Sequence, residues 1–259
     1  MSSKTKRQKH SAVMIMHYIS LTWRSILFLI LLFLWIANMV GGKETIMFRF
    51  EQNKPVIYIL WAAFAAEMTF RFFPSPIRSP GCQKQFKRNY HKTGRTDIVI
   101  ADNHATVLVA LVWIVLNGAI GALNMTDILN DDFMLLLSSA FSVCDMICIL
   151  FFCPFQSWFF KNRCCVTCRI YNWDFAMMFT PLFFVPRLYT WSLLAIAVAL
   201  LVRWEIAFYR YPERFSENTN SYLSCANCTE KLCRHKDQLA GLWKQIDKYR
   251  KEKLAKLRN

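Results

Sequence analysis

Residues 21–40 read LTWRSILFLILLFLWIANMV, an apolar run that only Arg24 interrupts. About 20 consecutive apolar residues in a helix cross the hydrocarbon core of a bilayer, so this run predicts a membrane-spanning helix. A cleaved signal peptide is the competing interpretation, because basic residues precede the run. No small-x-small cleavage site follows closely, with Ala37-Asn38-Met39 a poor candidate. We therefore expect a helix that the mature protein retains.

Further runs of the same length and character follow along the chain. They are Pro55–Phe73, Ala105–Leu123 and Phe133–Phe152. Hydrophobic residues make up 55% of the 259 residues, and only 19% are charged, whereas a typical soluble domain carries about 25% charged residues. The sequence predicts an all-α integral membrane protein, a polytopic helical bundle.

The region 174–209 is apolar over most of its length but contains Pro181 and Pro186. Two crossings with a turn need about 40 residues, so this region is barely long enough for both. Proline disfavours helix at the residue before it, which makes Pro186-Arg187 the natural turn. We expect a hairpin whose first arm is short or re-entrant, for a total of about six transmembrane helices.

The charge distribution predicts the orientation of these helices. The net charge is +15, and the connections 74–104 and 154–173 are basic, whereas 124–132 contains three Asp and no base. Lys and Arg accumulate in cytoplasmic loops. The N-terminus, both basic connections and the basic tail are therefore expected in the cytoplasm, in a cell membrane of bacterial type. Anionic lipid is the expected partner of these segments, together with another membrane protein but no nucleic acid.

The predicted organisation has three parts. Residues 1–20 form a basic cytoplasmic N-terminus, residues 21–209 the transmembrane helical domain, and residues 210–259 a cytoplasmic cysteine-rich basic tail. Within the tail, apolar residues recur at helical spacing from Leu239 to Tyr249 among many Lys and Arg residues. This pattern is typical of a basic amphipathic helix.

Ten cysteines are the strongest chemical signal. Two Cys-x-x-Cys turns are expected on the cytoplasmic side, and two such turns complete a tetrahedral thiolate shell for zinc or an iron–sulfur cluster. Because the turns flank the proposed hairpin, the sequence predicts that they meet. The expected ligands are Cys165, Cys168, Cys225 and Cys228, and the alternative ligands are Cys164, Cys233 and His235. A thiol–disulfide pair and inert cysteines remain alternatives.

The fourth apolar run carries three further cysteines and a carboxylate. Cys144 and Cys148 share a helical face in this run, whereas Cys153 would lie nearly opposite. We expect these cysteines to fill space in the packing. A carboxylate in a membrane helix is costly and faces the bundle interior, so Asp145 forms a structural hydrogen bond or serves a ligand or a pathway.

A second polar pair lies in the second apolar run. Glu67 and Arg71 are four residues apart, which predicts a pair within one helix. The same residues, together with Asp145, are also candidates for the polar core of a transporter.

No established reaction motif is present in the sequence. Phosphate-binding Gly-rich loops, Gly-x-Ser-x-Gly, His-Glu-x-x-His and the haem motif Cys-x-x-Cys-His are all lacking. The leading hypothesis is a redox relay or an assembly role around a metal or iron–sulfur site. A role without enzymatic activity is favoured. A transporter or channel-like protein with a structural zinc site is one alternative. A membrane thiol–disulfide oxidoreductase is the other.

Overall fold

The computed structural model describes residues 12–41, 45–74, 80–100, 103–160 and 167–224, together with Asn227 and Lys236. Over these ranges the chain is helical, and its one extended pairing is an isolated bridge between Lys92 and Asn220. The expected all-α architecture is confirmed at this level.

Four helices are long and apolar enough to cross a membrane: α1 (Ala12–Gly41), α5 (Asn103–Met125), α6 (Asp131–Leu150) and α8 (Leu188–Arg210). The predicted second run forms α3 (Lys54–Phe70), which has 17 residues and is therefore about 26 Å long, slightly less than a typical hydrocarbon core. A short helix, α2 (Ile46–Gln52), joins α1 to α3. The four apolar helices indicate a membrane protein.

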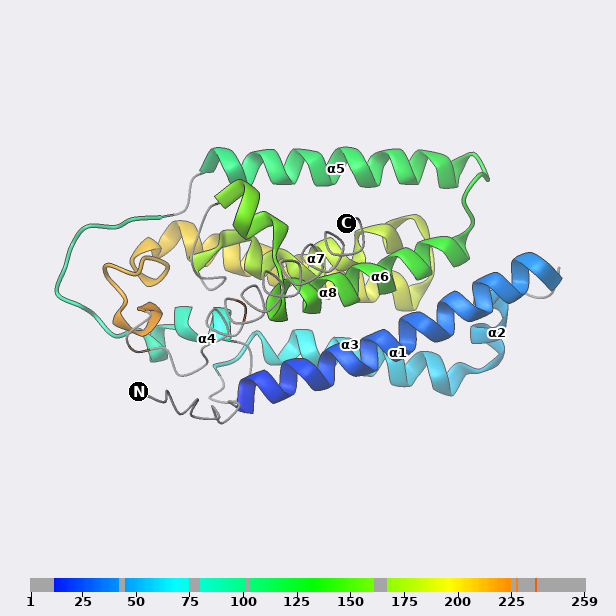
Figure 1. Ribbon diagram of the computed structural model, residues 1–259, viewed down its shortest axis with the longest axis horizontal. Helices are drawn as coiled ribbons and strands as arrows, with labels where there is room; N and C mark the ends of the chain where they lie inside the picture. Colours follow the sequence, from blue (N-terminus) through cyan, green and yellow to red (C-terminus); the bar gives the residue numbers. More distant parts are fainter. Residues whose placement is uncertain are drawn as a thin grey trace, which may run out of the picture.

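The helices pack around α6 (Figure 1). In this view α5 lies along one edge of the bundle, α1 and α3 lie along the opposite edge, and α6 and α8 lie between them. Helix α6 packs along α1, and α3 packs against α8. Large apolar side chains such as Phe33 and Val115 cover the outward surfaces of α1 and α5. Surfaces of this kind suit lipid far better than water.

The region 174–209 folds back on itself at the expected place. Its first arm is a broken helix made of α7 (Asp174–Phe179) and the 3₁₀ segment η5 (Thr180–Phe184), and α8 begins directly after Arg187. Val185, which precedes Pro186, has the extended backbone that a following proline favours. The turn predicted at Pro186-Arg187 is therefore confirmed.

Contacts at the two ends of this hairpin show its course. Arg169, in the 3₁₀ segment η4 (Arg169–Trp173), contacts Glu205 near the end of α8 and Asn103 at the start of α5. Arg187 instead lies 3.0 Å from Glu51, at the other end of the bundle. Residues 169–187 thus run the length of the bundle, antiparallel to α8. We call the end where α6 and α8 finish the thiol end.

The chain after α8 folds onto the connection between α3 and α5. The connection contributes α4 (Pro80–Gln85), the 3₁₀ turn η1 (Lys87–Asn89) and the residues just after it. The chain after α8 contributes the 3₁₀ turns η6 (Pro212–Arg214) and η7 (Ser221–Leu223) and the residues between them. The buried Asn220 amide donates to the Lys84 carbonyl at 3.0 Å, and the Ser221 N–H donates to the His91 carbonyl at 2.8 Å. The two segments therefore form one polar structure at the thiol end.

Candidate functional site at the thiol end

Arg24 is the centre of a buried polar network. Its side chain is 1% exposed, and its guanidinium reaches carboxylates on two other helices. Nη2 lies 2.6 Å from Glu67 on α3, and Nη1 lies 3.3 Å from Asp145 on α6. Nη1 also donates to the Ser142 carbonyl at 3.2 Å. An unpaired guanidinium in an apolar interior is very costly, so these contacts bind α1, α3 and α6 to one another.

A second ion pair joins the end of α3 to α7. Arg71 lies 2.5 Å from Asp174, and both side chains are almost fully buried. The predicted pairing of Glu67 with Arg71 inside one helix is replaced by two pairings between helices. Helical spacing identified the charged side chains, but it could not supply the partners Arg24 and Asp174, which come from distant segments.

A polar chamber of about 90 Å³ lies on one side of this network. Both guanidinium groups and Glu67 line it, together with Ser20 and His17 of α1. The Ser20 hydroxyl donates to Glu67 at 3.3 Å. The Nε2 atom of His17 is buried without a hydrogen-bond partner.

A larger cavity of about 300 Å³ lies on the other side, and we call it the thiol cavity. Asp145 and Asp174, the acidic partners of the two arginines, both line its wall. The two ion pairs therefore separate the polar chamber from the thiol cavity. Four cysteines also line it, namely Cys144, Cys148, Cys153 and Cys168.

The expected separation of Cys153 from Cys148 is wrong. Helix α6 ends at Leu150 with Phe151 as its C-cap, so Cys153 lies beyond the helix. Cys153 consequently lines the same cavity as Cys148 instead of facing away from it. The sequence places these residues on opposite faces only if the helix continues to Phe152, as the predicted run assumed.

The surroundings of Cys153 stabilise a thiolate. Besides the Cys148 thiol, the backbone N–H of Gln156 donates to its sulfur at 3.4 Å, at the start of the π-helical turn η2 (Phe155–Phe160). Hydrogen bonds from Cys148 and from this backbone, together with the positive charge of Lys236, lower the pKa of Cys153 from 9.0 to about 6. Thiols with such a pKa are largely ionised at neutral pH and are reactive nucleophiles.

Lys236 brings the tail to the same place. Its Nζ donates to the Cys148 carbonyl at 2.6 Å, beyond the end of the hydrogen-bonded part of α6. A cation is favourable at the carboxyl end of a helix, where carbonyl groups lack helical partners. Lys236 directly follows His235, so the second cysteine cluster in the sequence lies next to this contact along the chain.

Most of the predicted metal ligands lie outside the described residues. These are Cys165, Cys225 and Cys228 of the expected set, and Cys164, Cys233 and His235 of the alternative set. Cys168 is described and is buried against the α5 residue Val109 and Ile170. Within the described ranges no three His, Cys, Asp or Glu side chains form a group that could hold a metal ion. The amphipathic helix expected from Leu239 to Tyr249 is also outside them.

Glu205 forms a further charged cluster at the thiol end. It accepts hydrogen bonds from the Arg169 guanidinium and, at 2.7 Å, from the Trp173 indole. The Arg169 guanidinium also lies over the Phe208 ring, 4.4 Å from its centroid.

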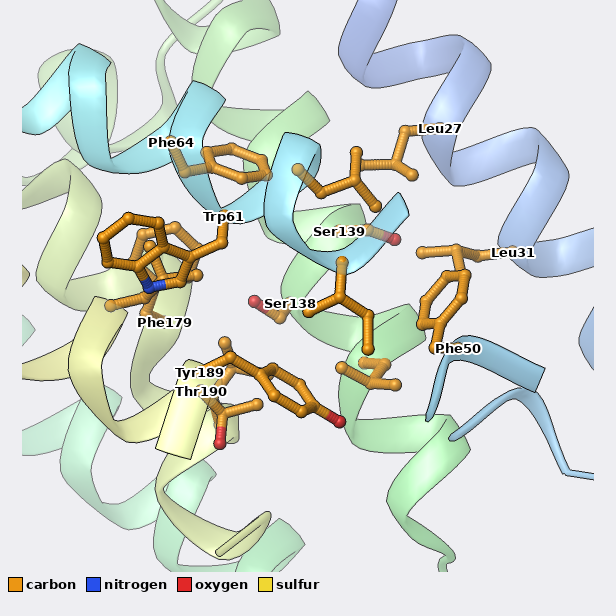
Figure 2. Close-up of a pocket in the computed structure, with 15 residues that line it drawn as sticks. Leu27, Leu31, Phe50, Trp61, Phe64, Ser138, Ser139, Phe179, Tyr189 and Thr190 are labelled. Atoms are coloured by element: carbon orange, nitrogen blue, oxygen red, sulfur yellow. The ribbon is translucent and has the colours of Figure 1, made fainter. Parts of the chain in front are cut away.

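Figure 2 shows a third cavity, of about 100 Å³, nearer the other end of the bundle. Side chains from six helices and η5 surround it, with Leu31, Phe50, Trp61 and Tyr189 on different sides. Ser138 and Ser139 contribute its main polar atoms from α6, but both hydroxyls donate to backbone carbonyls. With those hydroxyls satisfied, little in this cavity is left to bind a polar ligand.

Comparisons of this chain with protein families, with curated proteins and with solved structures found no match. The functional argument therefore depends on the geometry at the thiol end alone.

Proposed function

We propose that this chain is a membrane protein that acts as a thiol redox relay, with Cys148 and Cys153 as its dithiol. The observation that carries the proposal is that both cysteines line the wall of one cavity, where the backbone N–H of Gln156 donates to the Cys153 sulfur at 3.4 Å. The leading hypothesis from the sequence is a redox relay or an assembly role around a metal or iron–sulfur site. The proposed dithiol instead develops the alternative of a membrane thiol–disulfide oxidoreductase.

The relay reaction is a thiol–disulfide exchange. The Cys153 thiolate attacks one sulfur of a partner's disulfide, which breaks that S–S bond and releases one partner thiolate. Cys148 then loses its proton and attacks the Cys153 sulfur, which releases the second partner thiolate. One disulfide is consumed and one is formed, and the Cys148 proton and one proton from water pass to the two released thiolates. A thiolate nucleophile beside a second thiol is the arrangement this sequence requires.

The dithiol is tested by trapping and by pH. Reduced protein in detergent should react with a water-soluble disulfide to give an internal Cys148–Cys153 disulfide, identified by mass spectrometry of the digested protein. Alkylation of Cys153 should rise through a midpoint near pH 6, because the pKa of this thiol is about 6 and the thiolate is the reactive form. In Cys148→Ser the midpoint should shift upward, while Cys144→Ser should leave it unchanged. An alkylation midpoint near pH 9 in the wild-type protein would contradict the proposal.

The basic connections support a cytoplasmic location for the thiol end. Lys84, Lys87 and Arg88 lie at this end, whereas Asp127 and Asp131 lie in the connection at the other end. Reporter fusions after Asn259 and after Asp97 should both report cytoplasm, and a fusion within 124–132 should report the opposite side. An external C-terminus would contradict this orientation.

A metal centre is the second candidate function, and one contact favours it. Lys236 draws the tail to Cys148, at the end of the bundle where Cys168 lies. The proposed ligands remain Cys165, Cys168, Cys225 and Cys228, which would bind zinc or an iron–sulfur cluster through thiolates. Metal analysis of protein purified without oxygen tests this candidate, and visible absorption separates iron–sulfur from zinc. Cys225→Ser should then lower the metal content sharply and expose Cys168 to alkylation, whereas Cys144→Ser should do neither.

A further inference from the structure

The thiol cavity is built mainly from apolar and aromatic side chains. Trp113 of α5, Phe141 and Ile149 of α6, and Met177 and Met178 of α7 form most of its wall. Its volume of about 300 Å³ lies at the lower end of the range typical of small-molecule sites. An apolar chamber of this size suits a flat ring better than a hydrated metabolite.

The position of the cavity favours a ligand that arrives from the bilayer. It lies between α6 and α5, and Trp113 is the one α5 side chain in its wall. Helix α5 packs mainly against η5 and η2. Cys144 lines the same cavity and is exposed at the surface of the protein. A lipid-soluble ligand can therefore approach the cavity from the side of the bundle, past Cys144.

The chemical groups in the cavity wall restrict the class of ligand further. The dithiol of Cys148 and Cys153 holds two electrons and two protons that can be transferred together. Gln156 and Tyr171 add an amide and a hydroxyl group, and Asp145 adds a carboxyl group, so polar atoms are present for the edge of a ring. An apolar ring with carbonyl oxygens that accepts two electrons and two protons meets all these conditions.

We propose that the thiol cavity binds the ring of a lipid-soluble quinone, which oxidises the Cys148–Cys153 dithiol. This inference rests on the proposed function and identifies the electron acceptor of the relay. In the reaction the Cys148 S–H bond breaks, and one S–S bond forms with the Cys153 thiolate. The quinone takes up both electrons, the Cys148 proton and one proton from water, and leaves as the quinol. Partner thiols then reduce the disulfide by the reverse of the exchange described above, so electrons pass from thiols to the quinone.

The test uses the full-length reduced protein in lipid nanodiscs without oxygen. The probe is decylubiquinone, a fully substituted benzoquinone that lacks a free ring position for thiol addition. We expect one quinol per protein, measured by the ultraviolet absorbance change, and one Cys148–Cys153 disulfide, measured by mass spectrometry. Cys148→Ser and Cys153→Ser should abolish both signals.

A matched pair of variants tests the location. Met177→Trp places a larger side chain in the cavity wall, where Met177 is half-buried, and should slow quinone reduction about tenfold or more. Val115→Trp adds the same side chain on the exposed surface of α5 and should react like the wild type. Both variants should be oxidised by a water-soluble disulfide at the wild-type rate, which shows that their dithiol is intact.

The outcomes separate the two proposals. If the soluble disulfide oxidises the dithiol and decylubiquinone does not, the quinone inference is wrong and the relay survives. Failure of both oxidants contradicts the relay as well. Equal quinone rates in Met177→Trp and the wild type would show that the reaction occurs elsewhere on the protein.

Discussion

Helices α5 and α6 follow one another in the chain and are similarly apolar, yet they occupy different places in the bundle. In the most apolar stretch of each helix, 22% of the residues are buried in α5, whereas 44% are buried in α6. Helix α6 packs along α1 and against α7 and η5, whereas α5 lies at the edge. Mean hydropathy alone therefore does not distinguish a central helix from a peripheral one.

The difference comes from small and polar side chains. Helix α6 carries Ser138, Ser139 and Ser142, which are buried and let neighbouring backbones approach closely. It also carries Asp132 and Asp145, which accept hydrogen bonds or ion pairs from other helices. Helix α5 instead presents a row of large apolar side chains to its surroundings. Central position follows from polar partners, and this can be tested by removing them.

The largest effect is expected at Arg24. Arg24→Leu leaves the carboxylates of Glu67 and Asp145 without their guanidinium partner, and removal of one member of a buried pair costs about 3–5 kcal/mol. Thermal unfolding in detergent should show a much lower midpoint. Arg187→Ala is the control, because its pair with Glu51 is about half exposed and such pairs contribute about 1 kcal/mol or less. Equal midpoints for the two variants would refute the central role of the network.

A smaller loss is expected at the start of α6. The buried carboxylate of Asp132 accepts hydrogen bonds from the backbone N–H groups of Ile46 and Met47, at 2.9 and 3.0 Å, and so caps α2. Asp132→Ala leaves both N–H groups unsatisfied and should cost about 1–3 kcal/mol. The neighbouring Asp131→Ala should change the unfolding midpoint less. Both residues lie in the first turn of α6, but it is Asp132 that accepts the hydrogen bonds from α2. Faster proteolysis near α2 in Asp132→Ala alone would sharpen this assignment.

Two glycines of α5 provide a matched test of its single packed face. A Cβ atom at Gly121 would overlap Cζ of Phe184, so the ring must move, whereas a Cβ atom at Gly118 meets no atom within 4 Å. Gly121→Ala should destabilise by about 1 kcal/mol or more through overpacking. Gly118→Ala should be neutral or slightly stabilising, because alanine favours helix. The same unfolding response from both variants would mean that η5 does not hold α5.

The smallest effect on stability is expected from Asp145→Asn. Three carboxylates, of Glu67, Asp145 and Asp174, face two guanidinium groups, so a neutral side chain at position 145 leaves the charges balanced. Asparagine can still accept from Arg24, and we expect a change within about 1 kcal/mol. Unchanged redox exchange in this variant would agree with the relay. Normal accumulation with loss of a measured transport activity would instead favour the transporter alternative.

Much of the architecture could be predicted because bilayer length and proline chemistry act locally. The apolar runs and the turn at Pro186-Arg187 follow from these constraints. Helix α1, however, begins at Ala12, nine residues before the predicted run, because His17 and Ser20 are polar yet face the interior. A sequence pattern treats polar residues as exposed unless a buried partner is known. The partner of Ser20 is Glu67, which lies on another helix.

The candidate site could be predicted only in its residue types. Asp145, Glu67 and Arg71 were identified as intramembrane polar residues, and their pairing was misassigned because each partner lies on a different helix. Cys148 and Cys153 were expected to act in packing, because the predicted helix continued to Phe152, two residues beyond the observed end of α6 at Leu150. Two residues of continued helix would have turned Cys153 away from Cys148.

The junction between Lys84 and Asn220 has a consequence for the making of the protein. Gln85 accepts from Asn172 and the Lys84 carbonyl accepts from Asn220, so buried polar groups of α4 receive their partners from chain that is synthesised much later. At about 5–20 residues per second, the ribosome needs roughly 4–27 s to reach those partners after α4 has emerged. During that interval the connection between α3 and α5 must wait unsatisfied beside the insertion machinery. Truncation before Asn220 should therefore make this connection more sensitive to added protease, even where every membrane helix has already been inserted.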